Sequence, residues 1–141
     1  MSVPAPGGPA SWPSDVTTLC VPAHPDFVAS VRAVVRSTAV VADLAMEDVE
    51  ELQIAVNEAA ALLLPLAGST RGSGLSARLE VEPGRLCVRL WITGAQPGAA
   101  VDRGSLAWMM LSTLDPELQV VEAGDERAIE VSRARSGSSG A

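Results

Sequence analysis

The chain has 141 residues and a formal net charge of −7 at pH 7, and all 10 of its basic residues are arginines. An acidic chain without a clustered basic face is a poor match for nucleic acid or for an anionic membrane surface, and it favours a partner that carries a basic patch. At this length we expect one domain, and because aromatic residues make up only 3% of the chain, its core must be built from Ala, Val and Leu.

The first predicted elements are a tail, a strand and a helix. Residues 1–14 are rich in Pro, Gly and Ala, which predicts a disordered N-terminal tail. The β-branched segment Val16–Val21 predicts a short edge strand. Pro25 and Asp26 can begin a helix that runs to about Val41.

A second helix and a hairpin follow. Met46–Ala67 opens with an acidic turn and continues with apolar residues at helical spacing, which predicts a helix that weakens at Pro65 and stops by Gly68. After a loop, Leu75–Val81 and Leu86–Ile92 both alternate between apolar and polar residues. That period is typical of half-buried strands, and the tight turn between the two segments predicts an antiparallel hairpin.

The last third of the chain begins with a loop rich in Gly, Pro and Ala at Thr93–Asp102. We expect a helix over Ser105–Leu114 that ends at Asp115-Pro116. Two more strands are expected, at Leu118–Val121 and Ala128–Val131. The order strand, helix, helix, hairpin, helix, hairpin predicts an α+β sandwich with helices on one face of a mixed sheet. We expect residues 15–134 to form the domain and residues 135–141 to be a disordered C-terminal tail.

Compartment and cysteine chemistry can also be predicted. No apolar run approaches the length of a membrane span, and the N-terminus lacks the basic-then-apolar order of a signal peptide, so we expect a cytoplasmic protein. Cys20 and Cys87 are far apart, lie in predicted strands and lack the spacing of metal ligands. We therefore expect both to be reduced core residues, and we expect no metal site.

One carboxylate, Glu58, lies within the apolar run of the second helix, where an unpaired buried charge is costly. The surrounding pattern LQIAVNEAA, at Leu52–Ala60, resembles the helix that opens the ATP site in the anti-sigma-factor kinases of the Bergerat (GHKL, histidine-kinase-like) ATPase superfamily. The resemblance covers roughly Val16–Arg133. It implies a two-layer Bergerat sandwich, in which helices pack on one face of a mixed, mostly antiparallel sheet.

The resemblance implies a general base at Glu58, an Asn four residues later that holds magnesium, and often a His four residues beyond that. Here those two positions are Leu62 and Leu66. Asn57 lies about 100° from Glu58 around the helix, so it cannot simply substitute. Because phosphoryl transfer depends on a metal that neutralises charge and leucine offers no oxygen, we interpret Glu58 as a vestige of a catalytic site.

Two glycine-containing loops that bind nucleotide in those kinases are only partly matched in this sequence. Gly94 and Gly98 match an Asp-x-Gly-x-Gly loop, but its adenine-binding carboxylate is missing. Gly104 matches one glycine of a phosphate-binding Gly-x-Gly loop, and Ser105, a good N-cap, replaces the second. We therefore expect no bound cofactor. The residues that would form a remnant nucleotide site are Asn57, Glu58, Gly94, Gly98, Gly104 and Ser105.

The resemblance can be narrowed further. Gly104–Trp108 followed by Leu111–Leu114 is similar to actinobacterial anti-sigma factors of the stress and developmental sigma group. This similarity implies a homodimeric protein that sequesters an alternative sigma factor by direct binding and releases it to an anti-anti-sigma antagonist. We expect the partner-binding surface to include Val31, Arg32, Arg36, Glu47, Asp48, Glu50, Glu51, Arg103 and Trp108.

Two other functions stay open. The chain could be an active ATP-dependent serine kinase of the anti-anti-sigma factor, which would need ATP, Mg²⁺ and a replacement metal ligand such as Asn57. It could also be a homodimeric scaffold that binds no sigma factor.

Three features bear on which residues could contact another molecule. The acidic residues that begin the second helix equally suit a solvated helix face. Trp108, Met109 and Met110 cannot all face the core, because neighbours on a helix diverge by about 100°, so at least one is expected on the surface or in an interface. Trp91 is expected on the far face of the sheet, where it could contact another chain.

Overall fold

The computed structural model describes residues 15–68 and 73–136, which contain five strands and three α-helices. The strands are β1 (Val16–Pro22), β2 (Gly74–Glu82), β3 (Arg85–Ile92), β4 (Gln119–Ala123) and β5 (Glu126–Ala134), and the helices are α1 (Val28–Val41), α2 (Met46–Leu63) and α3 (Leu106–Leu114). Short 3-10 turns at Pro25–Phe27 and Leu64–Leu66 lead into α1 and out of α2. Every predicted helix and strand is present. Within the described ranges, no helix has the length and apolar character needed to span a bilayer.

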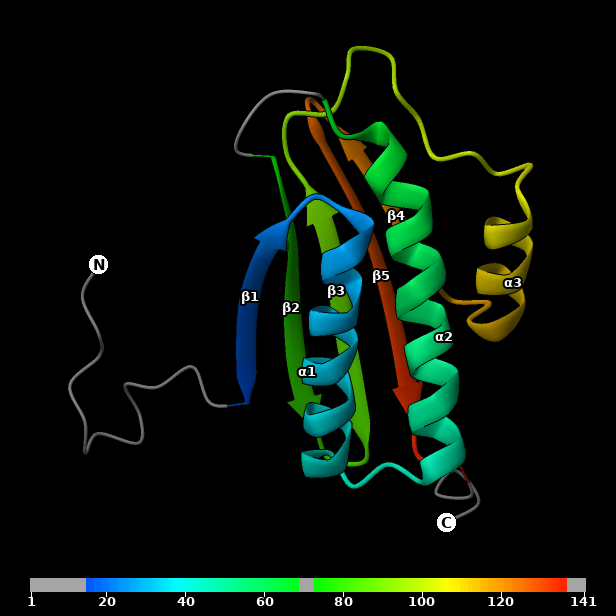
Figure 1. The fold of residues 1–141 in the computed structure, drawn as a ribbon. Coiled ribbons are helices and arrows are strands. Elements are labelled where there is room, and N and C mark those ends of the chain that lie inside the picture. Colours follow the sequence, from blue (N-terminus) through cyan, green and yellow to red (C-terminus); the bar gives the residue numbers. More distant parts are fainter. Residues whose placement is uncertain (1–14, 69–72, 137–141) are drawn as a thin grey trace, which may run out of the picture.

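The five strands form one sheet in the order β1-β2-β3-β5-β4, and every neighbouring pair is antiparallel (Figure 1). The expectation of a mixed sheet is therefore wrong for the described residues. Two helices separate β1 from β2 and return the chain to the end where β1 stopped, so that Pro22 pairs with Gly74. One helix separates β3 from β4, so these two strands run in the same direction, but β5 lies between them and no parallel pair forms.

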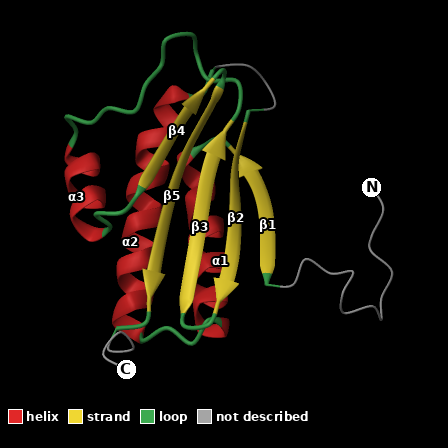
Figure 2. Ribbon diagram, turned by 180° about the vertical axis from the view of Figure 1, so that it is seen from behind, coloured by secondary structure: helices red, strands yellow, loops and turns green. Residues whose placement is uncertain are grey.

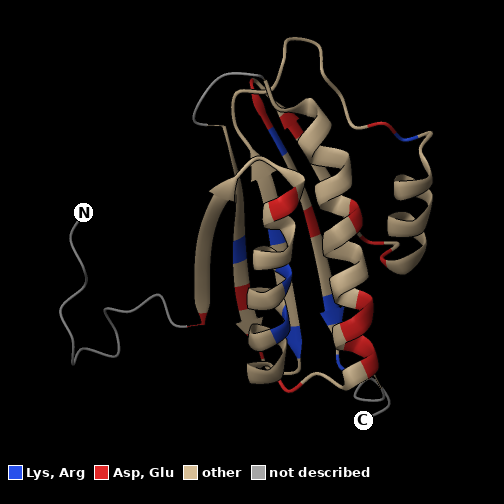
Figure 3. Ribbon diagram, viewed as in Figure 1, with Lys and Arg blue, Asp and Glu red and all other residues tan. Residues whose placement is uncertain are grey.

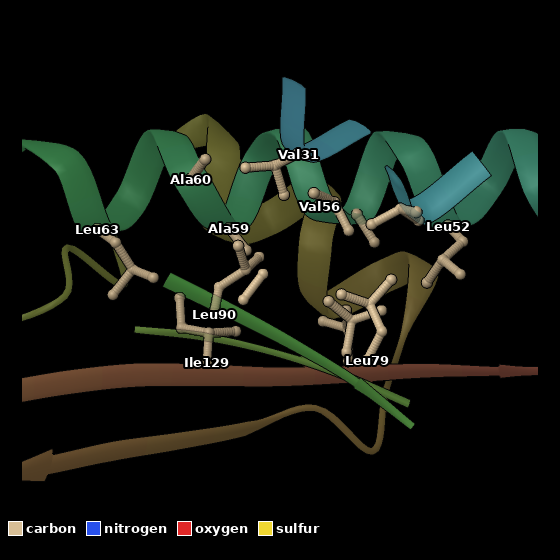
Figure 4. Packing of buried hydrophobic residues seen from close by; sticks show 14 of the residues in the cluster. Val31, Leu52, Val56, Ala59, Ala60, Leu63, Leu79, Leu90 and Ile129 are labelled. Carbon is tan, nitrogen blue, oxygen red and sulfur yellow. The ribbon is translucent and has the colours of Figure 1, made fainter. Parts of the chain in front are cut away.

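The three helices lie on one face of the sheet, and α3 lies beside α2 (Figures 1 and 2). The alternation predicted for β3 is confirmed, because its buried side chains are Leu86, Val88, Leu90 and Ile92. Figure 4 shows Leu90 and Ile129 of the sheet facing Ala59 and Leu63 of α2, all four with no exposed surface. Burial of this aliphatic layer, at roughly 1.5–3 kcal/mol for each large side chain, holds the two layers together.

The two cysteines are free thiols, as predicted, but they do not lie in the core. The alternation of β1 and β3 turns them away from the side that carries the buried Leu86, toward the sheet face without helices. Cys20 is exposed and Cys87 is half-buried. The prediction of core cysteines is therefore wrong, because in each strand the neighbouring positions supply the core residues.

The predicted N-terminal tail at residues 1–14 and most of the predicted C-terminal tail, residues 137–141, lie outside the described residues. Arg135 and Ser136 lie within the described residues, and they bond to the α1–α2 loop and to the first turn of α2. The Arg135 guanidinium donates to the backbone oxygen of Asp43 at 2.9 Å, and Ser136 donates to the Asp48 carboxylate. The described domain therefore continues two residues beyond the predicted boundary at residue 134.

Candidate functional site

Glu58 is partly exposed and lies on the outer side of α2, beside an open depression of about 430 Å³. The side chains that line this depression are Arg32, Glu50, Gln53, Ile54, Asn57, Glu58 and Met110. The structure therefore brings together four of the predicted site residues from α1 and α2, namely Arg32, Glu50, Asn57 and Glu58, with Met110 of α3 beside them. None of the described glycines lines this depression, so the predicted glycine loops do not meet Glu58 there.

Asn57 is held by α1. Its side-chain oxygen accepts a hydrogen bond from the Arg32 guanidinium at 2.7 Å, and Gln53 donates to the backbone oxygen of Arg32 at 3.1 Å. Arg36, one turn further along α1, donates to Gln53 at 3.5 Å and approaches the sulfur of Met46 at 3.8 Å. The two arginines thus form a polar seam between α1 and α2, and the Asn57 oxygen is already used within the chain.

Leu62 and Leu66 are both part of the hydrophobic core, with exposed fractions of 4% and 9%. Leu62 lies one helical turn after Glu58, at the position where the resemblance implies a metal-binding amide. Its side chain offers only hydrocarbon, and its burial leaves no room for a bound ion at that position. Leu62 therefore has a packing role in this structure.

Two of the three glycines of the predicted nucleotide loops, Gly94 and Gly104, donate to carboxylates of this chain. The Gly94 N–H donates to Asp125 Oδ2 at 3.2 Å, and the Gly104 N–H donates to Asp102 Oδ1 at 3.0 Å. Gly94 and Gly98 have positive φ angles of 74° and 77°, which explains why glycine occurs there. The backbone N–H groups of Gly94 and Gly104, two of the donors that could meet phosphate oxygens, are therefore engaged by negatively charged groups.

Ser105 has the structural role that its sequence context suggested. Its backbone is extended, and its hydroxyl oxygen accepts a hydrogen bond from the Trp108 N–H at 3.2 Å, which caps the beginning of α3. The same hydroxyl donates to the backbone oxygen of Asp102 at 2.8 Å. Both bonding directions of Ser105 are therefore satisfied locally.

A buried arginine that the sequence analysis did not identify fixes the loop between β3 and α3. Arg127 is 8% exposed and donates to the backbone oxygens of Ala99 at 2.9 Å, Gly124 at 2.7 Å and Glu126 at 2.8 Å. Its guanidinium lies 3.8 Å from the Glu122 carboxylate, which also accepts the Val101 N–H at 3.2 Å. The Arg127 bond to Ala99 and the Val101 bond to Glu122 thus hold the loop against the β4–β5 hairpin.

Arg103 and Trp108, two of the predicted partner-binding residues, contact each other. The Arg103 guanidinium lies 5.1 Å from the centre of the Trp108 ring, and it also lies 3.6 Å from the Glu122 carboxylate. Trp108 is half-buried and packs against the core, whereas Arg103 is exposed. This arrangement is a cation–π contact that joins the loop to α3.

The acidic residues at the beginning of α2 differ in accessibility, although Figure 3 shows acidic residues gathered on these turns. Glu47 and Glu50 are exposed, and Glu51 forms an ion pair with Arg133. Asp48 is 2% exposed, because its side chain turns toward Ser136 and accepts both of its hydrogen bonds. The prediction that Asp48 contacts a partner is therefore wrong for this structure.

Val31 is the second partner prediction that the structure contradicts. It has no exposed surface and lies on the α1 stripe that faces α2 and the sheet (Figure 4). A residue enclosed in the core cannot contact a partner without local unfolding. Of the three partner-binding residues predicted on α1, only Arg32 and Arg36 remain available at the surface.

Helix α3 exposes large apolar side chains. Leu106, Met109 and Met110 are 69%, 62% and 40% exposed, whereas Leu111 is fully buried. The expectation that Trp108, Met109 and Met110 cannot all face inward is confirmed. The outward stripe of this helix is apolar, and none of its nine residues carries a charge.

The far face of the sheet is polar around one aromatic residue. Trp91 is half-buried on this face, as predicted, and pairs in register with Ser76 and Ala128. Arg89, two residues earlier, forms ion pairs with Glu126 at 2.9 Å and Glu130 at 2.8 Å. Charged residues from β3 and β5 therefore surround the tryptophan.

The fold and these surfaces define a small α+β protein with a five-stranded antiparallel sheet, three helices on one sheet face and an apolar and acidic helical surface. Within residues 15–68 and 73–136, no group of three or more His, Cys, Asp or Glu side chains could hold a metal ion. No protein-family model matches the chain, and no curated protein shows a significant match to it.

Proposed function

We propose that this chain is an anti-sigma factor with a Bergerat-like sandwich, and that it sequesters an alternative sigma factor without using nucleotide. The observation that carries the proposal is the exposed apolar stripe of α3 beside the acidic outer side of α2. A surface of this kind suits a protein partner with basic and apolar residues much better than it suits an anionic nucleotide.

The contacts made by the candidate nucleotide-binding residues also support a function without nucleotide. Leu62 lies in the core, and the Asn57 oxygen accepts from Arg32. The N–H groups of Gly94 and Gly104 donate to aspartates, whose negative charges would repel a polyphosphate. The alternative of an active serine kinase would need these groups to be released and a metal ligand to be supplied from elsewhere.

The element order supports the Bergerat-like architecture. One strand, two helices, a hairpin, a helix and a second hairpin occur in the order that the resemblance implies. We propose this fold family as the finer description of the α+β sandwich, with the loop between β3 and α3 in the place of the glycine-containing nucleotide loops. Because Arg127 and Glu122 fasten that loop, it needs no ligand to hold its conformation.

The proposed mechanism is stoichiometric. The protein occupies a surface that the sigma factor needs for binding RNA polymerase, and an anti-anti-sigma antagonist releases it by competing for an overlapping surface. A homodimer would present two such surfaces. Since no phosphoryl transfer is involved, the balance of the three proteins depends only on their concentrations and affinities.

The experiment is titration of the purified protein against each purified sigma factor encoded in the same genome, followed by transcription with the cognate RNA polymerase. We expect one sigma factor to bind and its transcription to be inhibited in proportion to the protein, equally with and without Mg-ATP. Inhibition that requires ATP, or phosphorylation of an antagonist, would support the kinase alternative instead. Absence of binding to every sigma factor would overturn the proposed function.

A further inference from the structure

Helix α3 presents an unpartnered apolar stripe to solvent. Leu106, Met109 and Met110 have the i, i+3, i+4 spacing of residues on one helix face, and each is at least 40% exposed. On the opposite side, Leu111 anchors the helix in the core. A surface helix normally turns its polar residues outward, so an outward apolar stripe indicates a surface that another molecule covers.

Helix α2 continues this surface across the depression that Met110 lines. Ile54 is 42% exposed and lies in the middle of the α2 wall, with Glu50 and Glu58 one helical turn away on either side. Neither glutamate forms an ion pair with any residue in the described part of the chain. The apolar surface is therefore bordered by two carboxylates without an ion-pair partner, whereas Arg32, on the α1 side of the depression, donates to the Asn57 amide oxygen.

We propose that the depression and the exposed α3 stripe, together called the α2–α3 groove, bind a basic amphipathic helix of the partner. The depression presents Glu50, Ile54, Glu58 and Met110, and the stripe adds Leu106 and Met109. The apolar side of that helix would cover Ile54 and the α3 stripe, and its Lys or Arg residues would pair with Glu50 and Glu58. The identity of the partner as a sigma factor rests on the proposed function. The chemistry of the bound helix rests on the groove alone.

The geometry of the two carboxylates fits this occupant. Glu50 and Glu58 are eight residues apart on one side of a helix, which separates them by about 12 Å along its axis. Two basic residues about two turns apart on a bound helix have the same spacing, and the apolar residues between them would lie over Ile54. This is the helix-in-groove mode of recognition, in which adaptable methionine side chains adjust to the bound surface.

Charge makes a second copy of this chain a poor occupant. A symmetric contact through the groove would bring the Glu50 and Glu58 carboxylates of both copies to the same interface. Helix α3 has no basic residue to neutralise them, and the arginine that lines the depression, Arg32, donates to Asn57 within its own chain. A basic partner helix satisfies both the apolar and the acidic parts of the groove.

A designed peptide tests the groove directly. The probe is a fluorescent helical peptide of about 18 residues, long enough to span the groove, with leucines at i, i+3, i+4 and i+7 and arginines beside them. Its matched control carries glutamate in place of each arginine. We expect the basic peptide to bind, Ile54→Asp to weaken binding at least about tenfold, and the pair Glu50→Arg with Glu58→Arg to reverse the preference toward the acidic peptide.

Two surface variants away from the groove serve as controls. Val40→Asp changes a residue of α1 that is 67% exposed, and Glu82→Arg changes an exposed residue at the end of β2. Both should bind the basic peptide as the unchanged protein does. Absence of peptide binding, or equal binding by all variants, would overturn the groove as a docking site. Thermal unfolding of every variant shows whether the protein is still folded.

The same variants, titrated with the sigma factors, separate this inference from the proposed function. Sigma binding that is unaffected by Ile54→Asp and by the charge reversal would overturn the groove and leave the anti-sigma function standing. Groove-dependent peptide binding without binding of any sigma factor would support the groove and overturn that function. Loss of sigma binding in the groove variants alone would support both.

Discussion

The buried Asp48 carboxylate accepts two hydrogen bonds from Ser136, from its backbone N–H at 2.9 Å and from its hydroxyl at 2.6 Å, although 88 residues separate them in the chain. Asp48 lies in the first turn of α2, and Ser136 follows β5. Two ion pairs, Arg133 with Glu51 and Arg135 with Asp43, hold the same segment. The end of the sheet and the beginning of α2 are thus bound into one unit.

Replacing Asp48 with alanine should lower the free energy of unfolding by about 1–3 kcal/mol, because both Ser136 donors lose their acceptor. Urea denaturation followed by circular dichroism measures this loss. Glu47→Ala, in the same turn but exposed, should change stability by no more than about 0.5 kcal/mol. Ending the chain after Arg135 should cost as much as Asp48→Ala, and the two changes together should cost little more. Equal losses for Asp48→Ala and Glu47→Ala would contradict the contact.

Replacing Arg127 with methionine should release the loop between β3 and α3. Three backbone oxygens lose a charged donor, so we expect a loss of about 2–4 kcal/mol in stability and faster amide exchange at Val101. Hydrogen exchange followed by mass spectrometry measures the loop separately from the rest of the protein. Arg78→Met, on the far face of the sheet, removes a partly exposed ion pair and is the matched control. Unchanged exchange at Val101 in the Arg127 variant would show that other contacts hold the loop.

Millimolar Mg-ATP should leave the melting temperature unchanged. A ligand that binds only the folded protein would add about 2.7 kcal/mol of stability at 100 times its dissociation constant, so differential scanning fluorimetry would detect even moderate affinity. Glu58→Ala is the control for any signal. A saturable rise in melting temperature that this variant abolishes would contradict our interpretation of Leu62 and would favour the kinase.

Helix α3 should respond very differently to changes on its two sides. Leu111→Ala removes its buried anchor and should cost about 2–5 kcal/mol, whereas Met109→Ala, on the exposed side, should cost less than about 0.5 kcal/mol. Chemical denaturation compares the two variants directly. A large loss for Met109→Ala would mean that the outward stripe is packed within the monomer.

The two thiols should differ in reactivity. Cys20 is exposed and should react with a thiol reagent in the native protein well before the half-buried Cys87. Mass spectrometry of the partly labelled protein identifies the modified residue, and Cys20→Ser provides the control by removing the fast phase. Both thiols should react in denaturant without a reductant. Failure to label either one under those conditions would indicate a disulfide.

Periodicity predicted which residues of most elements face the core. The alternation of β3 predicted its inward side chains correctly. Val31, Val35 and Ala39 recur at helical spacing in the sequence and are all buried in α1, so the correction for Val31 could have been made from the sequence. Strand order could not be predicted, because alternation contains no information on which strand pairs with which.

The missed residues depend on contacts between distant segments or on element boundaries. Asp48 resembles any exposed acidic residue in a first helical turn until Ser136 is brought beside it. Arg127 was missed because the predicted strand began one residue later, at Ala128. A strand that begins at Glu126 places Arg127 on the same face as Ile129, so the correct boundary alone would have predicted an inward arginine.

Strand β5 comes last in the chain among the described strands, yet it lies inside the sheet and pairs with β3 through eight residue pairs. Until it leaves the ribosome, β3 has an open edge and α2 lacks part of the platform on which it packs. The nascent chain therefore cannot complete its fold segment by segment as it emerges. The sheet stays incomplete until Glu126–Ala134 has been made, and until then the chain presents an apolar strand edge to chaperones and to neighbouring chains.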